Sequence, residues 1–281
     1  MSETFLQGRV AIITGASRPG GIGREIARTF ARAGADVVVS DLERPLEGFP
    51  DYQLPDTSEL QATADELTAL GSRSTAVPCD VTVEADVVRL IDTTVEIHGR
   101  VDIMVNNAGV SLGLVPLAEL TVAAWDRSLE VMARGAFLGT REAVRAMRAQ
   151  GANGRIINMS SQAGKTGWPM LAAYSAAKFA VIGLTQSAAL EVGPDGITVN
   201  AICPGTVDTP LLEIDGGPMD VFSRMRGITR EEARERQRRA IPLRRFATPS
   251  DVAGTALFLA SDAGSFITGE AINVTGGEEI H

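Results

Sequence analysis

The chain has 281 residues, 44% of them hydrophobic, and a formal net charge of -9 from 26 basic and 35 acidic residues. This length suits one α/β domain whose core needs no disulfide support. The acidic balance argues against a nucleic-acid partner, and no apolar run is long enough to span a membrane. Residues 1–8 lack the pattern of a signal peptide, so we expect a cytoplasmic protein.

Short apolar runs alternate with amphipathic segments along most of the chain. Continuous apolar runs are typical of a parallel sheet that is covered on both faces. The alternation predicts right-handed βαβ units, hence a doubly wound parallel sheet (a Rossmann fold) in a single domain, residues 1–281. The expected strands are Arg9–Thr14, Asp36–Ser40, Ser74–Pro78, Val101–Asn106, Arg155–Ser160, Ile197–Ile202 and Ala271–Val274. The expected helices are about Gly23–Ala33, Glu84–Glu96, Ala123–Gln150, Tyr174–Gly193 and Pro249–Leu259.

Residues 42–60 interrupt this alternation. Prolines at positions 45, 50 and 55 exclude a continuous helix, so we predict an ordered loop. Ser58 is expected to cap the next helix, with Gln61 at the capping-box position. Long insertions are often functional, and this one is a candidate cover for the site beside it; a surface decoration or a subunit contact is the alternative.

Residues 209–242 form a second interruption, which we predict to cap the substrate site. It contains the sequence GGP at 216–218 and a charged helix, Thr229–Ala240, with a capping box of Thr229 and Glu232. The charged stretch Glu231–Arg239 is interpreted as a solvated helix face. A contact from one of its arginines to an anionic substrate is the less favoured alternative.

The sequence TGASRPGGIG, residues 14–23, joins the first strand to the first helix. Glycines let the backbone approach a pyrophosphate, and the N-terminus of the following helix offers free N–H groups to it. Many glycine-rich loops are plain turns, but this position between a strand and a helix favours nucleotide binding.

Asp41 follows the second strand, where a Rossmann fold recognises the adenosine ribose. A carboxylate there accepts hydrogen bonds from ribose hydroxyls and repels a 2′-phosphate. Arg18, in the glycine turn, argues for a phosphate instead. We favour NAD over NADP, because the charge of Asp41 lies where the phosphate would have to bind.

Tyr174 and Lys178 are separated by four positions, which places both on one face of a helix. A free tyrosine has a pKa of about 10, and a nearby cation lowers it by favouring the phenolate. Such a phenol can exchange a proton with a substrate oxygen while a hydride moves to or from a nicotinamide. Taken alone, the spacing also fits an ordinary amphipathic helix.

Further motifs resemble the short-chain dehydrogenase/reductase family over nearly the whole chain. Gly15, Gly21 and Gly23 are similar to its TGxxxGxG turn, although five residues separate the first two glycines here and three in the family. Ser161, 13 residues before Tyr174, stands where the family has its catalytic serine. The resemblance implies that Ser161 hydrogen-bonds the reacting oxygen, Tyr174 is the acid/base, and Lys178 lowers the phenol pKa and holds the nicotinamide ribose.

The resemblance also implies a set of cofactor contacts. Asp80-Val81 resembles the pair that contacts adenine, Asn107-Ala108-Gly109 the end of the NNAG motif, and Pro204–Thr209 the turn that meets the carboxamide. The expected cofactor-binding residues are Gly15, Ser17, Gly21, Ile22, Gly23, Asp41, Asp80, Val81, Asn107, Ala108, Gly109, Tyr174, Lys178, Pro204, Gly205, Val207 and Thr209. No metal site is expected, and Cys79 and Cys203 are interpreted as buried thiols.

Met132 departs from the family pattern. It stands in the sequence VMARGAF, where the family has V-N-x-x-G-x-F with a catalytic asparagine. A thioether cannot replace an amide in holding a relay water. We therefore expect an active enzyme with an altered proton relay.

The resemblance implies a secondary alcohol or the matching ketone as substrate, and a homotetramer. Leu112–Leu117, Trp168, Met170, Leu211 and Leu212 are candidates for an apolar pocket wall, with core packing as an equal alternative. Such a wall suits a cyclic or aromatic alcohol. A polyol stays open because the C-terminal sequence ITGEAINVTGG looks like that of some sugar-alcohol dehydrogenases, whereas 3-oxoacyl reduction is less attractive.

One further expectation and one alternative concern the cofactor. Some family members combine a similar insertion with tightly held NAD, so residues 42–60 are expected to cover the nucleotide and slow its release. The domain could instead bind a dinucleotide as a sensor or scaffold, with Met132 as a first step towards lost catalysis. The presence of Ser161, Tyr174 and Lys178 argues against that.

Overall fold

A seven-stranded parallel sheet forms the centre of the computed structural model, which describes residues 5–49, 52, 54–151, 153–214 and 216–281. The strand order is β3-β2-β1-β4-β5-β6-β7. This confirms the predicted doubly wound Rossmann fold in a single domain. The strands are β1 Val10–Thr14, β2 Asp36–Ser40, β3 Ser74–Ala76, β4 Ile103–Asn106, β5 Arg155–Met159, β6 Thr198–Pro204 and β7 Ala271–Val274.

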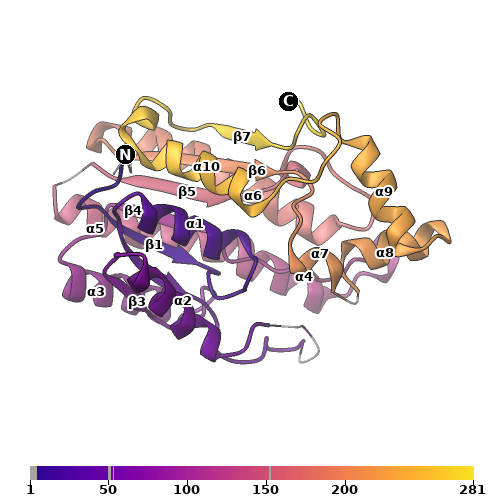
Figure 1. The fold of residues 1–281 in the computed structure, drawn as a ribbon, viewed down its shortest axis with the longest axis horizontal. Helices are drawn as coiled ribbons and strands as arrows, with labels where there is room; N and C mark the ends of the chain where they lie inside the picture. The colour runs from indigo at the N-terminus through magenta and orange to yellow at the C-terminus, as the bar shows by residue number, and fades with distance from the viewer. Residues whose placement is uncertain (1–4, 50–51, 53, 152, 215) are drawn as a thin grey trace.

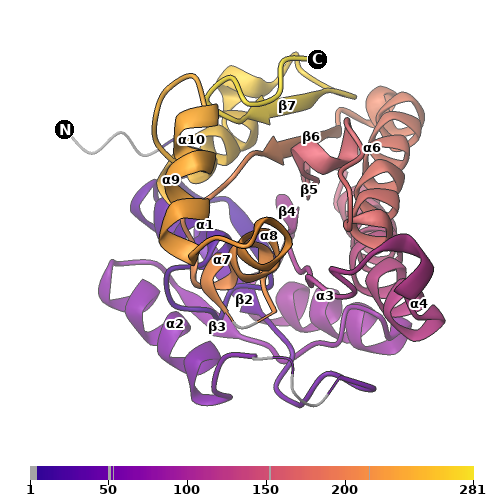
Figure 2. The ribbon, with the colours of Figure 1, turned by 90° about the vertical axis from the view of Figure 1, so that its right-hand side faces the viewer.

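Helices cover both faces of the sheet (Figure 1, Figure 2). One face carries α1 (Ile22–Arg32), α2 (Ser58–Ala69) and α10 (Pro249–Ala260). The other carries α3 (Glu84–His98), α5 (Gly135–Ala149) and α6 (Ala172–Val192). The remaining helices are α4 Val122–Leu129, α7 Pro210–Glu213, α8 Pro218–Arg226 and α9 Arg230–Ala240. Among the described helices, none is long and apolar enough to cross a membrane.

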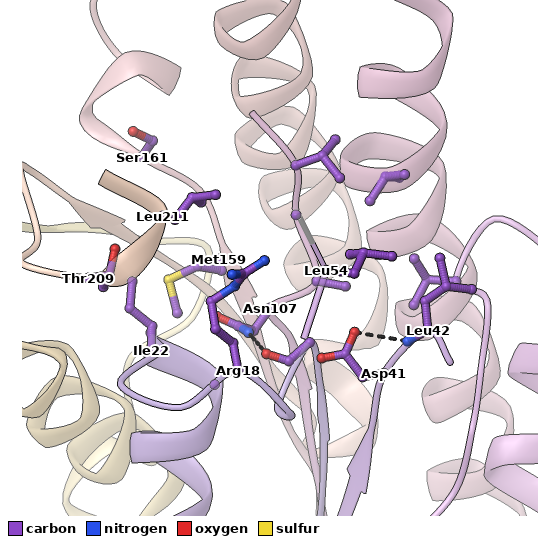
Figure 3. A pocket seen from close by; sticks show the side chains of 18 of the residues that line it. Arg18, Ile22, Asp41, Leu42, Leu54, Asn107, Met159, Ser161, Thr209 and Leu211 are labelled. Carbon is purple, nitrogen blue, oxygen red and sulfur yellow. Dashed lines mark hydrogen bonds between the residues drawn. The ribbon is translucent and has the colours of Figure 1, made fainter. Parts of the chain in front are cut away.

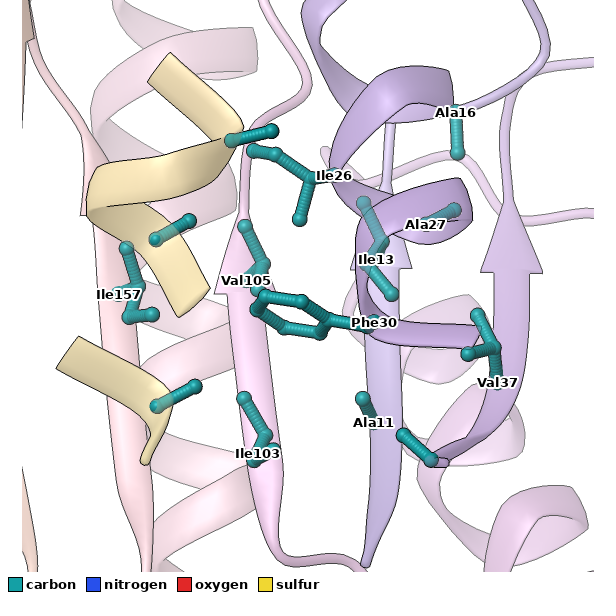
Figure 4. Close-up of a cluster of buried hydrophobic side chains, with 14 of the residues drawn as sticks. Ala11, Ile13, Ala16, Ile26, Ala27, Phe30, Val37, Ile103, Val105 and Ile157 are labelled. Carbon is teal, nitrogen blue, oxygen red and sulfur yellow. The ribbon is translucent and has the colours of Figure 1, made fainter. Parts of the chain in front are cut away.

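The continuous apolar strands supply both layers of the core, because successive side chains point to opposite faces. In β1, Ile13 packs towards α1 and α10, whereas Ile12 packs towards α3 and α5. Phe30 of α1 is fully buried over Ile13 and Val105 of β4 (Figure 4). This two-sided burial fixes the sheet and so fixes the positions at which its strands end.

Two local predictions need correction. Ser58 is the first residue of α2 and does not cap it; instead the Asp56 carboxylate accepts hydrogen bonds from the Ser58 backbone N–H (2.9 Å) and hydroxyl (2.6 Å). Gln61, expected to complete a capping box, donates to Asp65. In contrast, the capping box of Thr229 and Glu232 at α9 is confirmed.

The long helix expected over 123–150 contains a π-helical segment, Glu130–Arg134, between α4 and α5. Such segments insert one extra residue per turn and occur often at functional sites. Met132 lies inside it, so the departure from the family pattern coincides with a departure from regular helix geometry.

The insertion, residues 42–57 in the structure, runs from the end of β2 to the start of α2; its Pro50 lies outside the described residues. Arg44 pairs with Asp80, and Glu47 pairs with Arg127 of α4 at 3.3 Å. The predicted capping region contributes α7, α8 and α9 near the same end of the sheet (Figure 1).

Candidate active site

One cavity collects nearly all of the residues that the sequence singles out. It follows the carboxyl ends of the parallel strands, where open α/β sheets bind ligands. Figure 3 shows Asp41 and Leu42 at one part of it and Ser161 and Leu211 at another. The predicted residues in its wall are Gly15, Gly21, Ile22, Gly23, Asp41, Asp80, Val81, Asn107, Ala108, Gly109, Ser161, Tyr174, Lys178, Pro204, Gly205, Val207 and Thr209.

The glycine turn is close-packed against neighbouring backbone. Gly15 has a left-handed φ of +67°, and a Cβ on Gly23 would lie 2.3 Å from the carbonyl oxygen of Gly15. The Asn107 amide donates to the carbonyl oxygens of Thr14 and Gly15, both at 2.9 Å. Side chains at these glycines would force the turn apart. The glycine spacing differs from the family motif, but the close packing of backbone against backbone is kept.

The N-terminus of α1 opens into this cavity without a side-chain cap. Its N-cap residue is Gly21, which offers no acceptor, whereas α4, α9 and α10 are capped by threonine side chains. Uncapped N–H groups and the helix dipole suit an anion. The donor set therefore fits the pyrophosphate of a dinucleotide, held by Gly21, Ile22 and Gly23.

The carboxylate of Asp41 is held in place by hydrogen bonds within the protein. Its Oδ2 accepts from the Ser17 backbone N–H at 3.0 Å and from the Ser17 hydroxyl at 2.6 Å, and its Oδ1 accepts from the Leu42 N–H at 2.8 Å. Ser17 itself is buried and is absent from the cavity wall. Ser17 therefore positions Asp41, and its own expected contact with the cofactor stays a prediction.

Arg44 lies next to the site and was not indicated by the sequence: it is absent from the cavity wall but contacts Asp80, which lines it. Its guanidinium pairs with Oδ2 of Asp80, while Oδ1 of Asp80 accepts from the Thr82 N–H (3.0 Å) and hydroxyl (2.7 Å). The expected adenine contact, Asp80, is therefore tied to the insertion. A basic residue in a loop gives no periodic signal, so nothing in the sequence pointed to this pair.

The catalytic candidates come from β5 and α6. Ser161 follows β5, and its Oγ accepts from the Ala163 N–H at 3.1 Å. Lys178 is almost fully buried; its Nζ donates to the carbonyl oxygen of Met159 at 2.7 Å and lies 5.6 Å from the centroid of the Tyr174 ring. The three side chains thus line one part of the cavity, with the lysine behind the phenol.

Burial dominates the electrostatics of this part of the site. It lowers the pKa of Lys178 from 10.5 to about 8. It also raises the pKa of Tyr174, which the neighbouring Ser161 hydroxyl counteracts only in part. The sequence predicts a phenol whose pKa is lowered by Lys178, and the structure differs because desolvation of the phenolate is the larger effect. Burial therefore favours the protonated phenol, which can donate to a ketone oxygen, whereas oxidation of an alcohol requires the phenolate.

Met132 is buried and packs beside Gly109, since a Cβ on that glycine would lie 3.8 Å from the methionine sulfur. The position expected to hold a relay amide is thus occupied by an apolar side chain. Nothing polar on Met132 can extend the path from Lys178.

The predicted apolar wall is only partly present. Leu211 and Leu212 line the cavity, but Trp168 and Met170 do not. Leu112 and Leu114 are buried, whereas Leu117 is 74% exposed. The insertion adds further residues to the cavity wall, namely Leu42, Leu46, Tyr52, Leu54 and Pro55, and Figure 3 shows Leu42 and Leu54 near Asp41.

Charged groups elsewhere have partners within the fold. Arg234 pairs with Asp208 (2.7 Å) and Glu213 (2.5 Å), and Arg238 pairs with Glu235, which supports a solvated helix face over an anion site. Within the described ranges, no group of three His, Cys, Asp or Glu side chains could hold a metal ion.

The fold and the cavity together define a dinucleotide-binding α/β oxidoreductase, and comparisons with known proteins specify it further. A sequence profile described as Enoyl-(Acyl carrier protein) reductase matches residues 15–279. The chain is 40% identical to a cis-4-hydroxycyclohexanecarboxylate dehydrogenase of Sinomonas cyclohexanicum, over 99% of this chain and 98% of the relative. It is 36% identical to a sorbitol dehydrogenase of Cereibacter sphaeroides, over 97% and 98%.

A solved structure agrees with these relatives. The crystal structure of carveol dehydrogenase from Mycobacterium avium, in complex with NAD, superposes with a TM-score of 0.90 at 30% identity and covers 98% of both chains. The chain belongs to the short-chain dehydrogenase/reductase family. It is a dehydrogenase that acts on CH–OH groups.

Proposed function

We propose that this chain oxidises a cyclic, largely apolar secondary alcohol to its ketone with NAD, and that Tyr174 is the acid/base. One observation carries the proposal. Ser161, Tyr174 and Lys178 line the same cavity as the glycine turn and Asp41, so a dinucleotide bound along it would extend from Asp41 towards the phenol. Bound NAD would supply the hydride acceptor.

The residues account for the proton in this reaction. As the hydride leaves the alcohol carbon, the alcohol proton passes to the Tyr174 phenolate, and Ser161 donates a hydrogen bond to the reacting oxygen. In the reverse direction the neutral phenol returns the proton to the ketone oxygen. Lys178 would favour the phenolate and hold the nicotinamide ribose. With Met132 in the asparagine position, the onward path of the proton differs from the family pattern.

Asp41 supports NAD as the cofactor. Its carboxylate has a fixed position through Ser17 and Leu42 and faces the cavity. A 2′-phosphate placed there would meet a like charge. Arg18 lines the same cavity, and it lies in the glycine turn, where it suits the pyrophosphate.

The apolar wall supports a cyclic or aromatic alcohol over a polyol. Leu211 and Leu212 of α7 line the cavity, and an apolar surface leaves several hydroxyls without partners. Cyclic alcohols also appear in the names of two of the proteins compared above, those that act on cis-4-hydroxycyclohexanecarboxylate and carveol.

The two interruptions have proposed roles as covers. The insertion, held by Arg44 and Glu47, would cover the adenosine part of the nucleotide and slow its release. Residues 209–242 would cap the substrate. A homotetramer is proposed on the family pattern, and exposed Phe137 and Phe179 on α5 and α6, with Phe266 before β7, support it.

The direct test is a panel of cyclic, aromatic and sugar alcohols, mixed with the protein and either NAD or NADP, while NADH or NADPH absorbance is followed. We expect turnover with NAD and cyclic secondary alcohols. Turnover of polyols alone would replace the substrate proposal. No turnover of any alcohol in the panel, with NAD still bound, would favour a sensor or scaffold.

A further inference from the structure

The chain contains two tyrosines, and both line the same cavity. Tyr174 lies on α6, whereas Tyr52 lies in the insertion. The catalytic proposal uses only Tyr174. The phenol of Tyr52 is thus a polar group among the leucines that the insertion contributes to the wall, and the catalytic proposal gives it no role.

Tyr52 is held by the backbone that follows β4. Its Oη accepts a hydrogen bond from the Ser111 N–H at 3.3 Å. Its ring packs against a buried apolar cluster that includes Val110, Leu112 and Ala177, and Tyr174 packs against the same cluster. The phenol therefore has a defined position beside the catalytic end, immediately beyond the Asn107–Gly109 turn.

The hydroxyl of Tyr52 has an unused donor. A phenol donates one hydrogen bond and can also accept, and Ser111 uses an acceptor position. Within the part of the chain that the structure describes, the Oη–H finds no acceptor. Burial raises the pKa of Tyr52, so the group stays a neutral donor. Because Tyr52 is only partly buried and lines the cavity, this O–H is positioned to donate to a ligand oxygen there.

Charge near Tyr52 limits the kind of oxygen that it can meet. Asp41 and Arg18 both influence its pKa, in opposite directions, and the two cationic residues in the cavity wall, Arg18 and Lys178, have partners within the fold. A carboxylate beside Tyr52 would be attracted by Arg18, which already has a partner, and repelled by Asp41. A hydroxyl or carbonyl oxygen needs neither charge, and is the better match for a phenol that donates one hydrogen bond.

We propose that Tyr52 is a specificity-determining residue, whose O–H donates to an uncharged second oxygen on a cyclic alcohol while the reacting oxygen lies at Tyr174 and Ser161. This inference rests on the proposed function and narrows its substrate class to cyclic alcohols with a hydroxyl or carbonyl substituent. The insertion then contributes to substrate choice as well as to covering the nucleotide.

The test compares three alcohols on one ring: cyclohexanol, 1,4-cyclohexanediol and 4-hydroxycyclohexanecarboxylate. We expect the wild type to favour the diol over cyclohexanol by about tenfold in kcat/KM, mostly through KM, as one net hydrogen bond allows. Tyr52→Phe keeps the ring, and it should abolish that preference, whereas any loosening of the insertion through the lost Ser111 bond should affect cyclohexanol and the diol equally. Phe49→Leu is the matched control, because Phe49 packs against the same cluster and should preserve the preference.

Several results would overturn the assignment. An equal loss for cyclohexanol and the diol in Tyr52→Phe, with weaker NAD binding, would make Tyr52 a cofactor contact. A preference confined to the carboxylate, or a diol preference that survives Tyr52→Phe, would also contradict it. Wild-type turnover of cyclohexanol tests the proposed function separately, and a wild type that oxidises none of the three removes both proposals.

Discussion

The two ends of the cavity are built by different means. At the catalytic end, Ser161 follows β5 and Tyr174 and Lys178 project from α6, elements that are fixed by the sheet and its buried faces. At the adenosine end the insertion is held by an ion pair of Arg44 and one of Glu47, and its Tyr52 reaches the catalytic end, where it accepts a hydrogen bond from Ser111. Chemistry is thus placed on rigid elements, whereas the cover is held by interactions that are individually weak.

The largest effect is expected at the catalytic end. Tyr174→Phe removes the proton-exchanging hydroxyl and should lower kcat by about 10²- to 10⁴-fold, the range typical of general acid–base catalysis. NAD binding, measured by fluorescence quenching, should change little. A variant that keeps more than a tenth of wild-type activity would show that another group moves the proton.

The next effect is on stability and concerns the buried lysine. Because the pKa of Lys178 falls from 10.5 to about 8 on folding, the unfolded chain binds more protons between these pH values, and stability rises with pH there. Each pKa unit corresponds to about 1.4 kcal/mol, so nucleotide-free wild type should gain about 3 kcal/mol over that window relative to Lys178→Met.

Urea unfolding of both proteins at several pH values measures this difference. The comparison with the variant is needed because burial raises the pKa of Cys203 and of Cys79, the latter to about 12, and these groups oppose the trend at high pH. Parallel stability curves for the two proteins would mean that Lys178 is charged and well solvated in the folded state.

Asp41 lies at the adenosine end, and an intermediate effect is expected there. Asp41→Ala removes a charged hydrogen-bond acceptor for the ribose, worth about 1.5–3 kcal/mol, and should raise the Kd for NAD by at least about tenfold. Discrimination against NADP should fall in the same titrations. Exposed Glu43→Ala is the charge control; if it has the same effect, general repulsion and not ribose recognition selects the cofactor.

The smallest effect is expected in the cover. Arg44→Gln breaks the pair with Asp80, in which the arginine side chain is 52% exposed. Such a pair is worth about 0.2–1 kcal/mol, so stopped-flow release of NADH should accelerate about two- to fivefold. An acceleration of tenfold or more would show that the insertion clamps the nucleotide more strongly than its contacts indicate.

The same contrast explains what could be predicted from the sequence. The apolar strand pattern and the spacing of Ser161, Tyr174 and Lys178 are set by regular strands and helices. The fold and most of the cavity-lining residues could therefore be predicted. The Arg44–Asp80 pair and the place of Tyr52 were not, because a loop with several prolines has no period that fixes where its side chains point. The hydrogen bonds from Ser17 to Asp41 could not be predicted either, since a turn residue's direction depends on its tertiary partner.

The central claim is that hydride passes from an alcohol carbon to NAD in this cavity. The most direct measurement uses cyclohexanol deuterated at its hydroxyl-bearing carbon and determines by mass spectrometry whether the label reaches the nicotinamide. The account predicts singly deuterated NADH, formed in equal amount with cyclohexanone. Bound NAD without ketone or labelled NADH, for this and the other ring alcohols, would contradict it and leave a dinucleotide-binding protein that does not oxidise them.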